Sequence, residues 1–169
     1  MDSCFANAAV GQKGTSFHKM NLDEWREVIG INLEGVFFTF RAAIRHILER
    51  GGGGSLVGTS SLAAIMGQSR GEHYAAAKAG VLAIVRTIAA EYARHGIRAN
   101  AIVPGFVESG LTHELLKLEA YNKKVLPRIP QRRWGVPEDF GGMAVYFASD
   151  ASAYHSGDTV IIDGGFIRF

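Results

Sequence analysis

Residues 55–103, SLVGTSSLAAIMGQSRGEHYAAAKAGVLAIVRTIAAEYARHGIRANAIV, decide the fold of this chain. They contain a short apolar run at Ser55–Ser60, a long alanine-rich helical stretch at His73–Arg94, and a second short apolar run at Ile97–Val103. Gly96 separates the helical stretch from the second run. Two short buried-type strands joined by one long helix predict a crossover unit with parallel strands.

The same alternation continues toward the N-terminus. Cys4–Val10 is another short apolar run, and Asn21 then offers a helix cap with Glu24 three residues later, as in a capping box. A helical pattern follows to about Arg50, where the Gly51–Gly54 run ends it. This part of the chain therefore predicts a further strand and a further long helix.

The C-terminal part adds one more crossover. Leu111–Leu126 is amphipathic and irregular, Pro137-Glu138-Asp139 opens a helix that runs to about Ser149, and Thr159–Asp163 is a last strand. Residues 1–169 are therefore predicted to form a single α/β domain with about four parallel strands and crossover helices.

Composition excludes several classes of function. The chain has 169 residues, of which 47% are hydrophobic and 20% charged, and its net charge is +2, with the basic residues scattered rather than massed. We therefore expect a soluble globular protein that does not bind nucleic acid or span a membrane. Cys4 is the only cysteine and the histidines have no ligand spacing, so we expect a cytoplasmic protein without disulfide or metal.

Three side chains point to proton-transfer chemistry. Tyr74 and Lys78 are four residues apart and so share one face of the predicted helix. A tyrosine with its usual pKa of about 10 is a poor acid–base catalyst at neutral pH, but a neighbouring ammonium group favours the phenolate and lowers that pKa. Ser61, at the end of the preceding strand, could hydrogen-bond the same substrate oxygen. The three residues suit proton exchange at a carbonyl or alcohol oxygen.

Together with Asn32, inside the first long helix, these residues resemble the catalytic tetrad of the classical short-chain dehydrogenase/reductase family. The resemblance implies the C-terminal part of a doubly wound, Rossmann-like parallel sheet, and an NAD(P)-dependent oxidoreductase that interconverts a ketone and a secondary alcohol by hydride transfer. Further segments resemble family motifs in the same order: Ala6-Asn7-Ala8-Ala9, Ile31-Asn32-Leu33-Glu34-Gly35, His95-Gly96-Ile97-Arg98-Ala99-Asn100, Pro104-Gly105, Trp134-Gly135-Val136-Pro137-Glu138-Asp139 and Asp163-Gly164-Gly165.

The resemblance also implies a role for each residue. Tyr74 is expected to be the general acid in reduction and the base in oxidation, with Lys78 lowering its pKa and binding the nicotinamide ribose. Ser61 is expected to polarise the substrate carbonyl, and Asn32 to hold a water that links Lys78 to solvent. Taken alone, Asn32 could instead bend the helix or face solvent, and Ser61 could cap a turn. The residues expected to contact the cofactor are Asn7, Ala8, Tyr74, Lys78, Pro104, Gly105, Val107 and Ser109.

One family feature has no match in this sequence. The family begins with a strand and a turn Thr-Gly-x-x-x-Gly-x-Gly, whose backbone amides hold the cofactor pyrophosphate, and no glycines have that spacing here. We therefore expect an N-terminally truncated domain that lacks the N-terminal βαβ cofactor half, from a misplaced start codon or otherwise. Cofactor binding and turnover are expected to be impaired, and preference for NAD or NADP cannot be read.

Substrate and partners are predicted only by class. Residues 106–134 are expected to form the substrate loop, with Gln68, Ser69, Arg70 and His73 also facing the pocket, and the substrate is expected to be a small ketone or secondary alcohol. A homodimer or homotetramer, or a mixed oligomer with a full-length homologue, is expected. The alternative function is a non-catalytic fragment that acts as an interaction partner of such a homologue.

Overall fold

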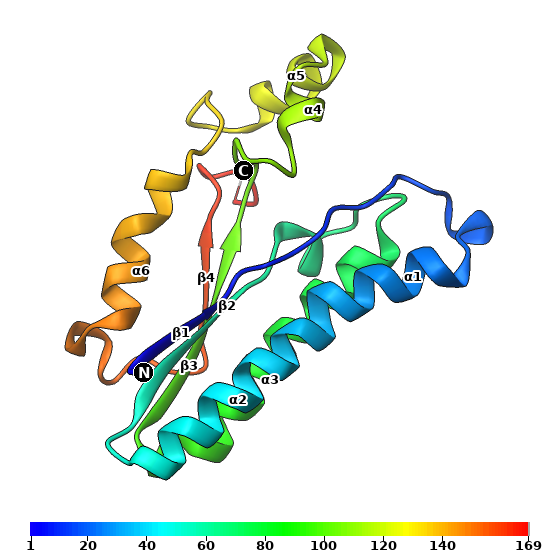
Figure 1. Ribbon diagram of the computed structural model, residues 1–169. Helices are drawn as coiled ribbons and strands as arrows, with labels where there is room; N and C mark the ends of the chain where they lie inside the picture. Colours follow the sequence, from blue (N-terminus) through cyan, green and yellow to red (C-terminus); the bar gives the residue numbers. More distant parts are fainter. Residues whose placement is uncertain (169) are drawn as a thin grey trace.

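Four short segments lie side by side as one parallel sheet in the computed structural model, which describes residues 1–168 (Figure 1). The central strands pair from Gly54 with Ile97 to Thr59 with Ile102. The predicted α/β fold with four parallel strands and crossover helices is confirmed. The strands, in their order across the sheet, are β1 (Ser3–Ala6), β2 (Gly54–Thr59), β3 (Ile97–Pro104) and β4 (Thr159–Ile162).

The first strand is shorter than the sequence predicts, because it ends at Ala6 rather than Val10. The Val10 N–H donates to Asn32 Oδ1 at 2.8 Å, and Asn32 Nδ2 donates to the Val10 carbonyl at 2.9 Å. Backbone groups bonded to a side chain are not available to pair with β2. Asn7 and Ala8 lie in the loop that follows the carboxyl end of β1.

One long helical segment follows this loop. It consists of α1 (Leu22–Ile29), a π-helical turn (Gly30–Glu34) and α2 (Gly35–Arg50). Asn21 caps it as predicted, since its Oδ1 accepts from the Glu24 N–H at 2.8 Å. The Glu24 side chain does not return to the cap but accepts a hydrogen bond from Thr15 at 2.9 Å. The predicted capping box is therefore only half formed.

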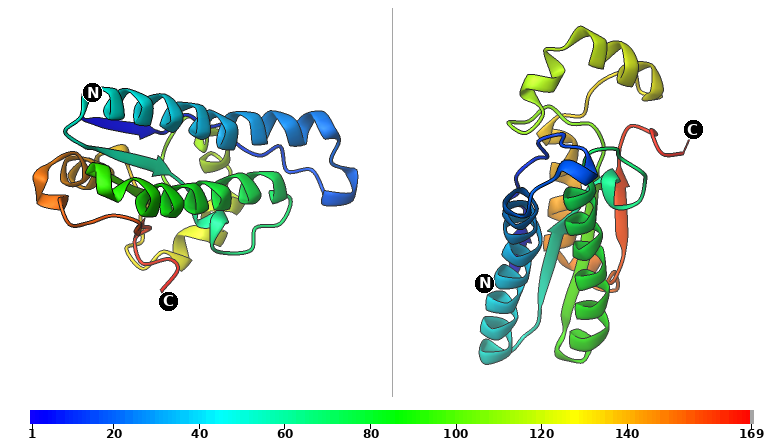
Figure 2. Two further views of the ribbon diagram at one scale, coloured as in Figure 1. Left: turned by 90° about the horizontal axis from the view of Figure 1, so that it is seen from below. Right: turned by 90° about the vertical axis from the view of Figure 1, so that its right-hand side faces the viewer.

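Helices cover both faces of the sheet (Figures 1 and 2). On one face pack α2 and α3 (Glu72–Tyr92), and on the other packs α6 (Gly141–Ala148). The predicted irregular segment 111–126 contains α4 (His113–Leu116) and α5 (Glu119–Val125), which lie beyond the carboxyl ends of the strands. Turns of 3-10 helix occupy Phe17–Lys19, Leu62–Ala64, Ala93–His95, Leu126–Arg128, Pro137–Phe140 and Asp150–Ser152.

The helix predicted from Pro137 to about Ser149 is divided. Its first turn, Pro137–Phe140, is a 3-10 turn, and α6 follows and ends at Ala148. The Asp139 carboxylate accepts a hydrogen bond from the Val136 N–H at 2.8 Å and forms a bidentate ion pair with Arg133. These bonds hold the Asp139 carboxylate back at the start of the helix and lower its pKa to about 2.

Two absences hold for the described residues, 1–168. No helix among them combines the length and hydropathy that crossing a bilayer requires. No three histidine, cysteine, aspartate or glutamate side chains gather as a metal site would need. The Cys4 thiol is half-buried on β1, and burial raises its pKa.

Candidate active site

A cavity of about 490 Å³ lies at the carboxyl ends of the strands. Open α/β sheets bind their ligands at such strand ends, and the volume falls in the range of about 300–1,000 Å³ that small-molecule sites have. The lining residues are Phe5, Asn7, Ala9, Thr59, Ser60, Ser61, Tyr74, Lys78, Ile102, Pro104, Gly105, Val107, Ser109, Leu111, Thr112, Pro137, Phe140 and Ala144.

Tyr74 and Lys78 reach this cavity from the first two turns of α3, on one helix face as their spacing predicted. The Lys78 Nζ lies 5.8 Å from the centroid of the Tyr74 ring. The next turns of the same helix are anchored to the sheet by Ala77, Val81 and Val85, all fully buried. The well-packed part of α3 therefore holds the two polar side chains in place.

Two hydrogen bonds of opposite direction join Lys78 to the end of β2. Its Nζ donates to the Thr59 carbonyl at 2.8 Å, and the Ser60 hydroxyl donates to the Lys78 carbonyl at 2.8 Å. Burial lowers the pKa of Lys78 from 10.5 to about 8, because a poorly solvated ammonium is disfavoured. The site therefore holds an amine that can exchange a proton in mildly alkaline solution.

The pKa of Tyr74 moves in the opposite direction to the one predicted. Burial raises it, and a hydrogen bond from Ser61 only partly opposes that rise. Lys78 does not lower the pKa of Tyr74 as expected, because the Lys78 Nζ is bonded to the Thr59 carbonyl rather than to the phenol. Ser61 also accepts the Ala63 N–H at 3.2 Å, so it caps a turn and faces Tyr74 at once.

Asn32 is not among the residues that line the cavity. It is fully buried in the π-helical turn, and its amide bonds both backbone groups of Val10. It therefore does not face solvent, and the helix continues through it into α2. Single π turns inside α-helices often mark functional positions. The water-holding role that the family resemblance implies for Asn32 stays a prediction.

The turns after β3 and β4 approach each other closely at Gly105. A Cβ there would lie 2.6 Å from the Asp163 Cα, so a larger residue would force the two turns apart. This approach brings the backbone of Pro104–Val107 to the cavity wall. Beyond it, the Ser109 N–H donates to Thr112 Oγ1 at 3.0 Å, and the two hydroxyls are 3.2 Å apart.

The cavity gathers most of the residues that the sequence singled out, but not all. Ala8 is exposed and Asn32 is buried, and neither lines the cavity. The expectation that Gln68, Ser69, Arg70 and His73 face the pocket is wrong: the first three are exposed outside the lining and His73 is fully buried. The predicted residues that line it are Asn7, Ser61, Tyr74, Lys78, Pro104, Gly105, Val107 and Ser109.

Sequence reasoning missed other parts of the wall. Phe140, in the 3-10 turn before α6, and Ala144, in α6, also line the cavity. Because α6 is apolar on all sides, periodicity does not reveal which of its residues face a cavity. Thr59 contributes a backbone carbonyl, which leaves no side-chain signal. The only sequence signal for Thr112 is its hydroxyl, three residues after Ser109.

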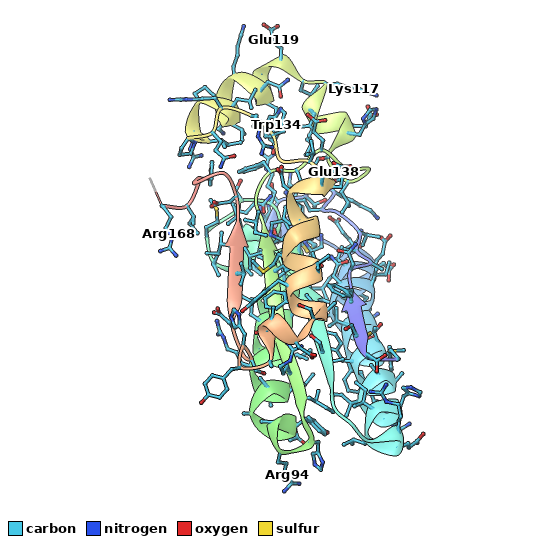
Figure 3. All side chains as sticks on the ribbon, turned by 90° about the vertical axis from the view of Figure 1, so that its left-hand side faces the viewer. Arg94, Lys117, Glu119, Trp134, Glu138 and Arg168 are labelled. Atoms are coloured by element: carbon cyan, nitrogen blue, oxygen red, sulfur yellow. The ribbon has the colours of Figure 1, made fainter. Side chains whose placement is uncertain are left out.

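The segment 106–134 is fixed at its base by aromatic packing. Tyr121 stacks on Trp134 with ring centroids 5.9 Å apart, and Phe106 meets Phe166 edge-on at 4.8 Å. Figure 3 shows Trp134 at the base of the segment and Glu119 at its outer tip, at the opposite end of the molecule from Arg94. The outer part, around α4, is largely exposed.

Comparison with known sequences points to one group of enzymes. A family model described as enoyl-(acyl carrier protein) reductase matches residues 1–167. The 2-dehydro-3-deoxy-D-gluconate 5-dehydrogenase of Escherichia coli (strain K12) is 38% identical over 144 residues, which cover 85% of this chain and 57% of that protein. The chain spans little more than half the length of the curated relatives it matches.

Solved structures agree with this. A candidate 2-deoxy-D-gluconate 3-dehydrogenase from Agrobacterium tumefaciens, with bound NADP, superimposes with a TM-score of 0.96 at 36% identity and covers 100% of this chain and 68% of its own. A short-chain type dehydrogenase/reductase from Mycobacterium marinum superimposes with a TM-score of 0.92 at 33% identity, covering 98% and 65%.

Proposed function

The chain belongs to the short-chain dehydrogenase/reductase family, and from that premise we propose that it forms the catalytic part of an NAD(P)-dependent oxidoreductase that interconverts a ketone and a secondary alcohol. The observation that carries the proposal is the single cavity lined by Ser61, Tyr74 and Lys78 together with the glycine turn at Gly105. Acid–base groups and an open backbone wall at the strand ends suit a carbonyl substrate beside a flat cofactor ring.

In this proposal Tyr74 gives its proton to the substrate oxygen during reduction and takes it back during oxidation. Ser61 hydrogen-bonds the same oxygen and stabilises the charge that develops on it. Lys78 restores the Tyr74 proton, for which its pKa of about 8 is suited. Burial keeps the Tyr74 phenol protonated, which favours its service as the acid.

The cavity fits the nicotinamide end of the cofactor. Gly105 leaves bare backbone at the wall, Lys78 offers donors to a ribose, and the Ser109 hydroxyl offers a partner to a carboxamide. Asn7 and Ala8, on the loop after β1, are proposed as further contacts. When bound, NADH or NADPH supplies the hydride, and the residues above place the substrate and move the proton.

We propose that the 169-residue polypeptide by itself binds this cofactor weakly and turns over slowly. Its sequence holds no glycine-rich turn of the kind that grips a pyrophosphate. Residues 106–134 are proposed to cover the substrate within the single domain 1–169. A small hydroxylated ketone or alcohol is the proposed substrate class, supported by the sugar-acid names of several relatives. A cytoplasmic location stays a prediction.

Replacement of the proposed acid tests the function. Tyr74→Phe should lower kcat for ketone reduction by about a thousandfold, the usual weight of a positioned proton donor. Tyr154→Phe is the matched control, because Tyr154 is fully exposed and lines none of the described cavities. Turnover is followed by the absorbance of NADPH at the highest soluble cofactor concentration. Activity of Tyr74→Phe within tenfold of the parent would contradict the proposal.

A second candidate function rests on an apolar surface. Phe37 and Phe38 on α2 are about half exposed, beside a groove of about 530 Å³ between α2 and α3. Exposed apolar patches of this kind mark association surfaces. We propose that this face pairs subunits, as a homodimer, a homotetramer or a mixed oligomer with a longer homologue. Light scattering should show Phe38→Asp as a smaller species than the parent, and equal masses would contradict the proposal.

A further inference from the structure

A group of buried polar side chains lies just outside the cavity, at the start of α3. The Oε1 of Gln12, the Oε1 of Glu24, the Oε2 of Glu72 and both ring nitrogens of His73 are buried without a hydrogen-bond partner. His73 is fully buried, and it directly precedes Tyr74. Burying a polar group without a hydrogen bond costs free energy of folding. The presence of these groups in the interior therefore needs an explanation.

Glu24 is the centre of this group. Its Oε2 accepts from the Thr15 hydroxyl at 2.9 Å, and its Oε1 lies 3.5 Å from His73 Nε2. On α1 the carboxylate could have closed the capping box at the helix surface, where solvent would help to stabilise its charge. Instead it is 7% exposed and turned toward α3. The Thr15 hydroxyl and the His73 ring are the polar groups that face the buried carboxylate, and they help to offset the cost of burying it.

The pair connects two walls of the proposed active site. Thr15 belongs to the loop after β1, which begins with the cavity residues Asn7 and Ala9. His73 belongs to the helix turn that carries Tyr74. A second contact joins the same two segments, since a Cβ on Gly71 would lie 1.9 Å from Gln12 Oε1. The loop therefore lies against the start of α3 at Gly71 and is also connected to it through Glu24.

We infer that Glu24 and His73 are a buried positioning pair, which sets the place of Tyr74 relative to the loop that carries Asn7. The inference rests on the proposed function, because it assigns to the pair the alignment of the proton donor. Neither side chain lines the cavity, so the pair acts through Tyr74 rather than on a substrate.

Two substitutions of His73 separate the hydrogen-bond donor from the space that the ring fills. His73→Gln keeps a donor that can reach Glu24, whereas His73→Phe fills the same space without one. We expect His73→Phe to lower kcat about tenfold with the KM for the ketone within about twofold, and His73→Gln to retain kcat within about threefold. Glu27→Gln is the matched control, since Glu27 is on the same helix and pairs with Lys13 of the same loop, but at the surface.

A readout independent of turnover keeps this inference separate from the proposed function. Titration of the Tyr74 phenol by ultraviolet difference absorbance, with Tyr74→Phe as reference, should give a pKa raised by about 0.5 units or more in His73→Phe, because the Ser61 hydrogen bond weakens. His73→Gln should match the parent. If His73→Phe does not fold, the double variant Glu24→Met/His73→Phe, which leaves no buried charge unpaired, takes its place in both measurements.

Each outcome decides the inference. A Tyr74 titration that is displaced in His73→Phe but not in His73→Gln or Glu27→Gln supports it, even where the parent shows no turnover. Equal titrations and equal kcat in both His73 variants would overturn it, as would a loss of stability in His73→Phe with an unchanged Tyr74 pKa and kcat.

Discussion

The two faces of the sheet are packed very differently. Against α2 and α3 lies a continuous buried cluster that includes Phe40, Leu56 and Val85 and extends to Phe166. Against α6 the buried cluster consists of Val57, Ile102 and Phe147, with half-buried neighbours. Leu56 and Val57 are adjacent in β2 and point into the two clusters, as alternation in a strand requires. The cavity therefore has one densely packed wall, which carries Tyr74 and Lys78 and is called the firm wall below. The opposite wall, which carries Phe140 and Ala144, is sparsely packed.

Two matched phenylalanines test this contrast directly and should give the largest effects on stability. Phe40 on α2 is 1% exposed and Phe147 on α6 is 0% exposed. Phe40→Ala should reduce the free energy of unfolding by about 4 kcal/mol, because dense packing relaxes little around the new space. Phe147→Ala should cost about 1–2 kcal/mol less, since its sparser surroundings can collapse. Urea unfolding measures both, and a larger loss for Phe147→Ala would break the comparison.

A smaller effect is expected for the buried amide of Asn32, which bonds the loop after β1. Asn32→Ala removes two buried hydrogen bonds to Val10 and should cost about 2–3 kcal/mol. Asn21→Ala, at an exposed cap of the same helical segment, is the control and should cost about 1 kcal/mol. Urea unfolding of both variants gives the difference. Equal losses would mean that the Val10 contact adds nothing beyond an ordinary cap.

These two asparagines also show how far sequence reasoning reaches. The capping role of Asn21 and the shared face of Tyr74 and Lys78 follow from local spacing, and both were predicted. The bond between the Val10 backbone and Asn32 joins residues 22 positions apart, and no local pattern encodes it. The Glu24 side chain likewise points toward His73 because of tertiary contacts, although the local sequence favours a capping box.

The pH dependence of stability should show the smallest effect. Burial lowers the pKa of Lys78 to about 8 from 10.5 in the unfolded chain, so the folded state binds fewer protons between these values. Stability should therefore rise with pH through this window, and the burial cost is fully present below about pH 8. Lys78→Met removes that cost.

Urea unfolding of Lys78→Met and the parent checks this. The stability advantage of Lys78→Met should be about 1–2 kcal/mol larger at about pH 7.5 than at about pH 9.5. Tyr74 is present in both proteins and Lys78 is not among the causes of its raised pKa, so its contribution cancels in the difference. A difference that does not change with pH would mean that the Lys78 amine is better solvated than its burial indicates.

We propose that the residues lining the cavity at the strand ends form the nicotinamide end of a dinucleotide site, and that the firm wall holds its acid–base groups. Calorimetric titration of the 169-residue chain with reduced nicotinamide mononucleotide, and separately with adenosine 2′,5′-bisphosphate, tests it most directly. We expect saturable binding of the nicotinamide half with a Kd of about 1 mM, weakened about tenfold by Lys78→Met, and no saturable binding of the adenosine half. Binding of the adenosine half alone, or of neither half, would contradict it.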